Sequence, residues 1–363
     1  MTGDNSMCPE PPLVPGVERI AVLRPNGVGD FIFALPALET LRAAYPHAHI
    51  TLLGKAWHAD FLRGRPGPVD HVEVLPPVRG VGAEAHQVQD DAQVERFLER
   101  MRRRRFDLAL QLFGGGRHSN PFVQRLGARM SAGLRAADAP PLDRWHPHLP
   151  LQNERLRLLE AVALVGARPV CLAPRLALAA RDQDEARLHL PEEQPSLIVL
   201  QPGASDARRR WPAHKFAAVA DALHGRGYRL AINGTRDERA IVARVRHHMR
   251  APALDLSGVL SLSGLAGLLA RARLLVSNDT GPLHLAQAVG TATVGIYWFT
   301  NLLVSAPLAQ ARHRHLVALR SRCPACGAEN LTRRCAHDPS FVDEVEPDQV
   351  LEAALELLAA PSS

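Results

Sequence analysis

An acid, a hydroxyl and an imidazole lie close together in the sequence at Asp279, Thr280 and His284. An apolar run typical of a strand precedes them and one typical of a helix follows, so we predict a strand-to-helix turn. Gly281 would supply backbone freedom, and Pro282 suits the first turn of a helix. The free N–H groups and positive dipole end of such a helix bind anions. We therefore expect a phosphorylated ligand here, although a single histidine on a helix is also compatible with a structural role.

A second glycine-containing turn follows the first predicted strand. Gly27 and Gly29 permit a tight turn and close approach of a ligand to the backbone. A dinucleotide fingerprint would need a third glycine, where this chain has Ile32, and an acid after the second strand, where it has Lys55. These two departures argue against NAD. Asp30 stands at the start of the next helix, where it is either an N-cap or a catalytic group.

Arginines cluster after a later predicted strand. Gly203 follows this strand, and Arg208 to Arg210 come shortly before a helix. Because an arginine fork neutralises phosphate oxygens well, the cluster is a candidate diphosphate site. The alternative is a solvated loop in an arginine-rich protein.

The next strand ends in a turn that contains two acids, Asp237 and Glu238, after Thr235. A carboxylate at this place accepts hydrogen bonds from ribose hydroxyls in many nucleotide sites. Equally, Thr235 could cap the helix while the two acids favour its first turn. Both interpretations stay open.

Cys323, Cys326, Cys335 and His337 form a late cluster of metal-ligand types. Their spacing matches no common zinc finger closely. The alternatives to a structural metal are reduced cysteines or a redox-sensitive loop. The sequence does not decide between them.

Strand and helix patterns alternate along the chain, so we predict an α/β protein with parallel sheets covered on both faces. Such sheets bind ligands at the carboxyl ends of their strands, where each motif above falls. The predicted organisation is two Rossmann-like domains facing a central cleft, residues 1–175 and 176–345. A C-terminal helix, residues 346–363, is expected to pack back towards the N-terminal domain. The predicted elements are strands 19–23, 49–53, 71–75, 107–112, 196–200, 228–232, 254–256, 274–276 and 293–297, and helices 31–45, 94–101, 153–165, 213–224, 237–249, 261–271 and 282–289.

Composition describes a globular protein, with 46% hydrophobic and 22% charged residues among 363. The net charge is +6, but Lys55 and Lys215 are the only lysines, a skew typical of a GC-rich genome. We find no nucleic-acid motif and expect no nucleic-acid partner. The first fifteen residues lack the features of a secretory signal, so we expect a cytoplasmic protein.

Taken together, the turns resemble glycosyltransferase family 9, the ADP-heptose:lipopolysaccharide heptosyltransferases. The resemblance covers most of the chain and rests on three groups of residues. They are Gly27-Val28-Gly29-Asp30 with Leu35-Pro36-Ala37-Leu38, Pro202-Gly203-Ala204 with Arg209-Arg210-Trp211-Pro212, and Asn278-Asp279-Thr280-Gly281 with His284.

This resemblance implies a GT-B fold and inverting transfer from a nucleotide-sugar without a cofactor or catalytic metal. It makes Asp30 the general base that takes the acceptor's proton. The leaving diphosphate would be stabilised by the amides around Thr280 and Gly281 and by Arg209. The implied donor-binding set also contains Gly203, Glu238 (or Asp237), Asp279 and His284.

On the acceptor side the resemblance implies Gly29, Lys55 and Arg117, with a glycan or glycolipid acceptor and peripheral contact with the inner face of the cytoplasmic membrane. The chain departs from the family in two places. Arg209 stands where the heptosyltransferases often have lysine, and the segment 111–120 differs from that of the core heptosyltransferases. Two alternatives stay open, a non-catalytic nucleotide-sugar binding protein and another GT-B enzyme such as a sugar-nucleotide epimerase.

Overall fold

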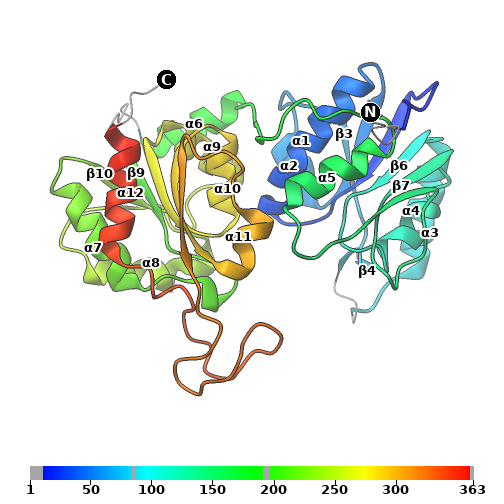
Figure 1. Ribbon diagram of the computed structural model, residues 1–363. Coiled ribbons are helices and arrows are strands. Elements are labelled where there is room, and N and C mark those ends of the chain that lie inside the picture. Colours follow the sequence, from blue (N-terminus) through cyan, green and yellow to red (C-terminus); the bar gives the residue numbers. More distant parts are fainter. Residues whose placement is uncertain (1–10, 84–86, 191–196, 360–363) are drawn as a thin grey trace, which may run out of the picture. The chain divides into compact units, whose positions relative to one another are not determined.

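The computed structural model describes residues 11–83, 87–190 and 197–359. The chain divides into two compact units, Met1–Leu172 and Ala173–Ser363 (Figure 1). The sequence placed this division three residues later, after residue 175. Each unit has its own sheet and its own core, so each is described by itself.

The sheet of the first unit has the strand order β3-β2-β1-β6-β7-β8, and every neighbouring pair is parallel. Its elements are β1 (Arg19–Leu23), α1 (Val28–Ala44), β2 (His49–Gly54), α2 (Ala56–Leu62), β3 (His71–Val74), β4 (Val78–Arg79), β5 (Gly82–Ala83), α3 (Asp91–Arg103), β6 (Leu108–Gln111), α4 (Ser119–Gln124), β7 (Met130–Arg135), β8 (Arg144–Pro147) and α5 (Glu154–Ala163).

Helices cover both faces of this sheet because alternate strand residues point to opposite sides. Ala21, Leu23 and Leu53 pack against α3 and α4 in one apolar cluster. On the other face α1 packs beside α5, which also contacts β6, β7 and β8 (Figure 1). This burial on both sides explains why β1 and β2 are almost continuously apolar.

The second unit repeats this plan with the strand order β11-β10-β9-β12-β13-β14, again parallel throughout. Its elements are α6 (Ala180–His189), β9 (Leu197–Gln201), the 3-10 turn η1 (Ala207–Arg209), α7 (Ala213–His224), β10 (Arg229–Ile232), η2 (Arg236–Glu238), α8 (Arg239–His248), β11 (Leu254–Asp255), α9 (Leu262–Arg271), β12 (Leu274–Asn278), α10 (Gly281–Ala288), β13 (Ala292–Trp298), α11 (Phe299–Ser305), β14 (His313–Ala318) and α12 (Pro347–Ala359).

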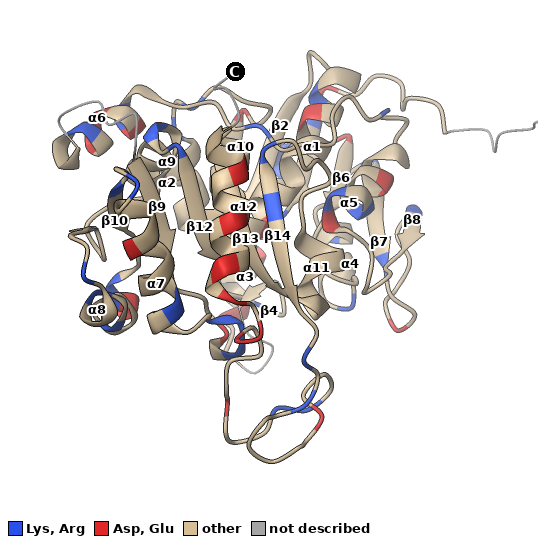
Figure 2. Ribbon diagram, turned by 60° about the vertical axis from the view of Figure 1, so that its left-hand side comes forward, with Lys and Arg blue, Asp and Glu red and all other residues tan. Residues whose placement is uncertain are grey.

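The C-terminal helix α12 belongs to the core of the second unit. Val350, Ala354 and Leu358 are buried there together with side chains of α7, β12 and β13. Acidic residues occupy its exposed face, visible as red bands in Figure 2. The apolar face of the helix is therefore used within its own unit, and the expected packing towards the N-terminal domain stays a prediction.

The predicted elements exist, with shifted ends. Helix α1 begins at Val28 after the N-cap Gly27, so Asp30 lies inside the first turn and is not the N-cap. The predicted strand start at Ser196 and the last residues of the C-terminal helix lie outside the described residues. The prediction did not include β7, β8 and β14, which form one side of each sheet. Among residues 11–83, 87–190 and 197–359, no helix has the length and apolarity needed to cross a membrane.

Candidate active site

Each sheet reverses its strand order at one point, between β1 and β6 in the first unit and between β9 and β12 in the second. In doubly wound sheets the loops at the carboxyl ends of these strands form the ligand site. Asp30 follows β1, Gly203 follows β9 and Asp279 follows β12. The fold therefore places the motifs singled out from the sequence at the two switch points.

In the first unit, a buried arginine fixes the backbone that carries Asp30. Arg24 donates from Nε and Nη2 to the carbonyl oxygen of Asp30 at 3.1 and 2.9 Å. Its Nη2 also lies 3.6 Å from Oδ1 of the Asp30 carboxylate, which is 45% exposed. The carboxylate is thus accessible, while the turn that positions it is held by a fully enclosed cation.

Glu154 and Arg157 of α5 complete this network. Arg24 pairs with Oε1 of Glu154 at 2.9 Å, and Arg157 pairs with Oε2 of the same carboxylate. Burial lowers the pKa of Arg24 to about 10, against the opposing effect of the Asp30 charge, and the guanidinium stays protonated at neutral pH. Two cations and two carboxylates balance, which is the condition for holding such charges away from water.

Lys55 and Arg117, the predicted acceptor-side residues, are exposed at two other strand ends of this sheet. Lys55 precedes α2, and its backbone N–H donates to Nδ1 of His58 at 3.0 Å. Arg117 lies 3.8 Å from Asp138 in a loop that the buried side chains of Gln111 and Asn120 hold in place. Gly29 lies in the first turn of α1. All three predicted residues thus follow strands at the same edge of the sheet.

In the second unit, Asp279 is the centre of the predicted donor turn and is 2% exposed. Its Oδ1 contacts Nε2 of His284 at 3.0 Å and accepts a hydrogen bond from Ser305 at 3.1 Å. Burial raises the pKa of this carboxyl, but the hydrogen bonds and charges of His284, Arg209 and Ser305 outweigh burial and hold the pKa below its usual value. Asp279 is therefore a buried carboxylate.

Arg209 is the arginine of the cluster that joins this site. Its Nη1 lies 3.4 Å from Oδ2 of Asp279, and its Nη2 donates to Ser205. Arg208 instead pairs with Asp206, and Arg210 donates to the carbonyl of Ala204. Of the three arginines in the predicted diphosphate site, Arg209 alone contacts Asp279.

Gly203 and Glu238 lie against each other. A Cβ built on Gly203 would stand 2.0 Å from Oε1 of Glu238, so this glycine makes room for the carboxylate. Glu238 also accepts a hydrogen bond from the N–H of Thr235 at 2.9 Å, which closes the start of the helix. Glu238 therefore has the capping role and lies at the strand ends, whereas Asp237 is exposed.

Thr280 and Gly281 form the start of α10, with Thr280 as N-cap and Pro282 in the first turn. Both are partly exposed, so the first N–H groups of the helix are available to an anion. Gly281 does not adopt a positive φ, and the backbone freedom expected of it is not used.

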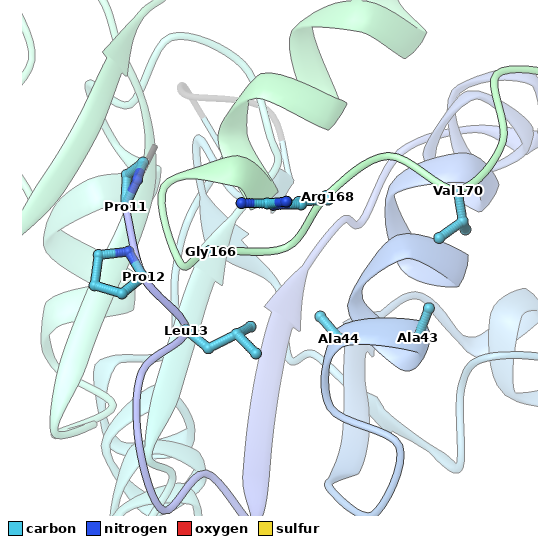
Figure 3. Close-up of a pocket in the computed structure, with 8 residues that line it drawn as sticks. All are labelled: Pro11, Pro12, Leu13, Ala43, Ala44, Gly166, Arg168 and Val170. Atoms are coloured by element: carbon cyan, nitrogen blue, oxygen red, sulfur yellow. The ribbon is translucent and has the colours of Figure 1, made fainter. Parts of the chain in front are cut away.

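Two cavities lie away from these turns. One of about 520 Å³ is lined by Pro11, Leu13, Ala44 and Arg168 among others (Figure 3). Ala44 ends α1, about 20 Å along the helix axis from Asp30. The other, about 380 Å³, lies between the amino ends of β1 and β2 and the end of α3, and its lining includes Arg19, His49 and Arg104. Neither belongs to the switch points.

Two doubly wound units, each with polar residues at its switch point, are the architecture of the GT-B class. The chain belongs to glycosyltransferase family 9 (heptosyltransferase), whose model matches residues 94–332. Lipopolysaccharide heptosyltransferase 2 of Salmonella typhimurium is 28% identical over 300 residues, 77% of this chain and 82% of that protein.

Solved structures have the same fold. A family 9 glycosyltransferase from Veillonella parvula matches with a TM-score of 0.79 and 21% identity, covering 94% of this chain and 97% of its own. E. coli ADP-heptose lps heptosyltransferase II matches with a TM-score of 0.73 and 20% identity, covering 94% and 98%. The predicted family, fold class and enzyme class are confirmed.

Sequence reasoning did not assign a role to four residues that organise the site. Arg24 directly follows a buried strand in the first glycine-containing turn, and this position is the signal from which its role in the site could have been predicted. Glu154 and Arg157 share an i, i+3 spacing on a predicted helix, a signal for an ion pair. Ser305 reaches Asp279 from α11, a helix that the sequence analysis did not predict.

Proposed function

We propose that this enzyme transfers heptose from ADP-heptose to a lipopolysaccharide core acceptor, with inversion at the anomeric carbon and without a catalytic metal. The observation that carries the proposal is Arg209, held by a buried carboxylate beside the start of α10. The names of the heptosyltransferase relatives supply the donor and acceptor classes.

The second unit would bind the donor. Arg209 and the first N–H groups of α10 would take the diphosphate, because a guanidinium and a helix start both favour anions. Glu238, beside Gly203, would accept hydrogen bonds from the ribose hydroxyls. This arrangement neutralises the leaving group with fixed protein charges.

Asp279 and His284 would support this site indirectly. Both carboxylate oxygens of Asp279 already have partners, and the side chains of both residues are nearly inaccessible. We therefore assign them to the positioning of Arg209 and of the start of α10, not to contact with donor hydroxyls.

In the transfer step Asp30 would act as the general base. It takes the proton of the acceptor hydroxyl while that oxygen forms a bond to the anomeric carbon. The bond from the anomeric carbon to the diphosphate breaks at the same time, and ADP leaves with the electron pair. Attack opposite the leaving group inverts the configuration.

The first test is transfer from ADP-heptose, GDP-sugars and UDP-sugars to heptose-deficient lipopolysaccharide, each with and without EDTA. We expect product from ADP-heptose alone, unaffected by EDTA, with NMR showing an inverted anomeric centre. Donor incubated alone should stay unchanged, and a rearranged sugar would favour an epimerase. Binding without product would favour a non-catalytic protein.

Because the proposed acceptor is linked to a lipid, the enzyme would meet it at the cytoplasmic face of the inner membrane. We expect a fraction of the enzyme to sediment with vesicles that contain the acceptor and to stay in solution with vesicles of the same lipids without it. Equal sedimentation with both vesicles would contradict acceptor-directed docking.

A further inference from the structure

The four late metal-ligand residues meet in the structure. One ligand atom each from Cys323, Cys326, Cys335 and His337 lies within 4.8 Å of the others. Ligand atoms around a tetrahedral zinc ion are about 3.8 Å apart, given Zn–S bonds of about 2.3 Å. The cluster is therefore within about 1 Å of the geometry that one shared ion requires.

We propose that these four side chains bind one zinc ion as a structural site. Three thiolates and one imidazole fill all four positions of a tetrahedral ion, so no position remains for a substrate or a reactive water. The site is separate from the residues assigned to sugar transfer. Its role is to fix the segment between β14 and α12.

The first two cysteines are brought together by a tight backbone turn. The N–H of Gly327 donates to the carbonyl of Cys323 at 2.8 Å, and the N–H of Cys323 donates to Ala328 at 2.9 Å. Gly327 has a φ of 71°, a left-handed conformation that favours glycine. The turn thus presents Cys323 and Cys326 on one side, as a pair of ligands to one ion needs.

Asn330 ties the third cysteine to this turn. The side chain of Asn330 accepts a hydrogen bond from the N–H of Cys335 at 3.1 Å and donates to the carbonyl of Ala328 at 3.1 Å. Asn330 is fully buried in a segment that is otherwise largely exposed. A buried amide used this way fixes the relative position of the two halves of the cluster.

Both ends of the segment are anchored, because Cys323, Phe341 and Val342 are buried in the core of the unit, but residues 324–334 add few apolar contacts. Between β14 and α12 the chain forms a long loop, orange in Figure 1, with one isolated bridge between Arg322 and Glu329. Cys326 and His337 are exposed, and Leu319 and Leu331 do not enter the core. A metal cross-link would add its binding free energy to the stability of this long loop.

The loop also supports the donor side of the second unit. Asn330 accepts a hydrogen bond from Arg208 at 3.1 Å, and the N–H of Phe341 donates to the carbonyl of Arg208 at 2.7 Å. Arg208 precedes Arg209. The bound ion therefore stabilises the segment that presents the donor-site arginine, a consequence that rests on the proposed function.

The direct test is the metal content of the full-length protein, purified under reducing conditions with its affinity tag removed. We expect about one zinc per chain by mass spectrometry, in line with a closed four-ligand site. Cys326→Ser and Cys335→Ser should lose the metal and melt at a lower temperature. Cys171→Ser, in the other unit, is the matched control and should keep both.

Wild-type protein without bound metal, even after incubation with zinc, would overturn the proposal. So would an intact mass lower by two hydrogens, which marks a disulfide. About one iron per chain in place of zinc would overturn the assignment to zinc.

A second measurement does not depend on the folding of the variants. Cobalt added to chelator-treated wild-type protein should give the intense d–d and thiolate charge-transfer bands of a four-coordinate sulfur-rich site. Weak bands typical of six-coordinate cobalt would contradict the proposal. Neither readout involves a donor sugar, so failure here is distinguishable from failure of the proposed transferase reaction.

Discussion

Arg209 and Asp279 form an ion pair at the end of β12, with Nη1 of Arg209 3.4 Å from Oδ2 and 3.3 Å from the carbonyl oxygen of Asp279. The other carboxylate oxygen contacts His284 and Ser305. Asp279, the acid of the predicted phosphate-binding turn, therefore holds a cation in place and has no free carboxylate oxygen to offer a ligand.

Replacing Arg209 should weaken donor binding. Arg209→Ala removes charge-assisted hydrogen bonds of about 1.5–3 kcal/mol, so we expect KM for the donor to rise about 10- to 150-fold. Arg209→Lys keeps the charge and loses the fork geometry, so its KM should lie between those of the wild type and of Arg209→Ala. Initial-rate kinetics with ADP-heptose gives both values.

Arg226→Ala is the control for this pair of variants, because Arg226 is exposed in the same unit and its side chain donates to the carbonyl of Ala222. It should leave KM unchanged. An Arg209→Ala enzyme with the wild-type KM would remove Arg209 from the donor site.

Gly203→Ala should act through Glu238. The new methyl group would displace the carboxylate and weaken its hydrogen bond from the N–H of Thr235, so we expect a loss of about 1 kcal/mol of stability. We expect the KM of Gly203→Ala to match that of Glu238→Ala, and the double variant to be no worse than either. A double-mutant cycle tests this coupling, and fully additive effects would contradict it. Gly225→Ala is the control, since its added methyl makes only ordinary contacts.

The sequence was sufficient to predict the fold and the principal turns, because both depend on local signals. Continuous apolar runs such as β1 and β9 indicate buried parallel strands, and glycine and acid at their ends indicate ligand turns. Strands β8 and β14 were harder to predict, because they are partly exposed and lack a continuous apolar pattern. Strand β7 is buried, but its sequence, with Ser131 and Gly133 at its centre, also lacks a continuous apolar run.

The contacts among buried polar residues were not predictable from the sequence. The pairing of Arg24 with Glu154 joins residues far apart in the chain, and no local rule determines it. No local rule determines the hydrogen bond from Ser305 to Asp279 either. The cysteine cluster was predictable in part. The sequence shows the types of the four ligand residues, but only the folded loop shows that their ligand atoms meet.

Glu154→Gln should destabilise the first unit. It leaves Arg24 and Arg157 buried with less negative charge than the network requires, a change that costs about 3–5 kcal/mol in comparable sites. We expect a clear fall in the melting temperature. Glu99→Gln, on the exposed face of α3, should melt like the wild type. Equal melting temperatures for both variants would show that the network contributes no stability.

His58 should make the first unit less stable in mild acid. Burial lowers its pKa from 6.5 to about 3, so the folded protein keeps it neutral while the unfolded chain binds a proton below pH 6.5. Proton binding therefore stabilises the unfolded state relative to the folded state as the pH falls from 6.5 towards 3, by about 2 kcal/mol at pH 5.

His58→Gln removes this titration and can still accept the hydrogen bond from Lys55. The difference in melting temperature between wild type and variant should shift in favour of the variant between pH 7 and pH 5. His47→Gln, an exposed histidine at the end of α1, is the control. A difference that stays constant with pH would contradict the predicted neutral state.

Asp30→Asn should abolish transfer while the enzyme stays folded and binds donor. Arg24 holds the turn through the backbone carbonyl of residue 30, so the side-chain change leaves these hydrogen bonds intact. We expect kcat to fall about 10²- to 10⁴-fold, the usual contribution of a general base, with KM for the donor unchanged. ADP should raise the melting temperature of the variant as it does that of the wild type. The exposed Asp60→Asn is the control, and an Asp30→Asn enzyme with near-normal turnover would require another base.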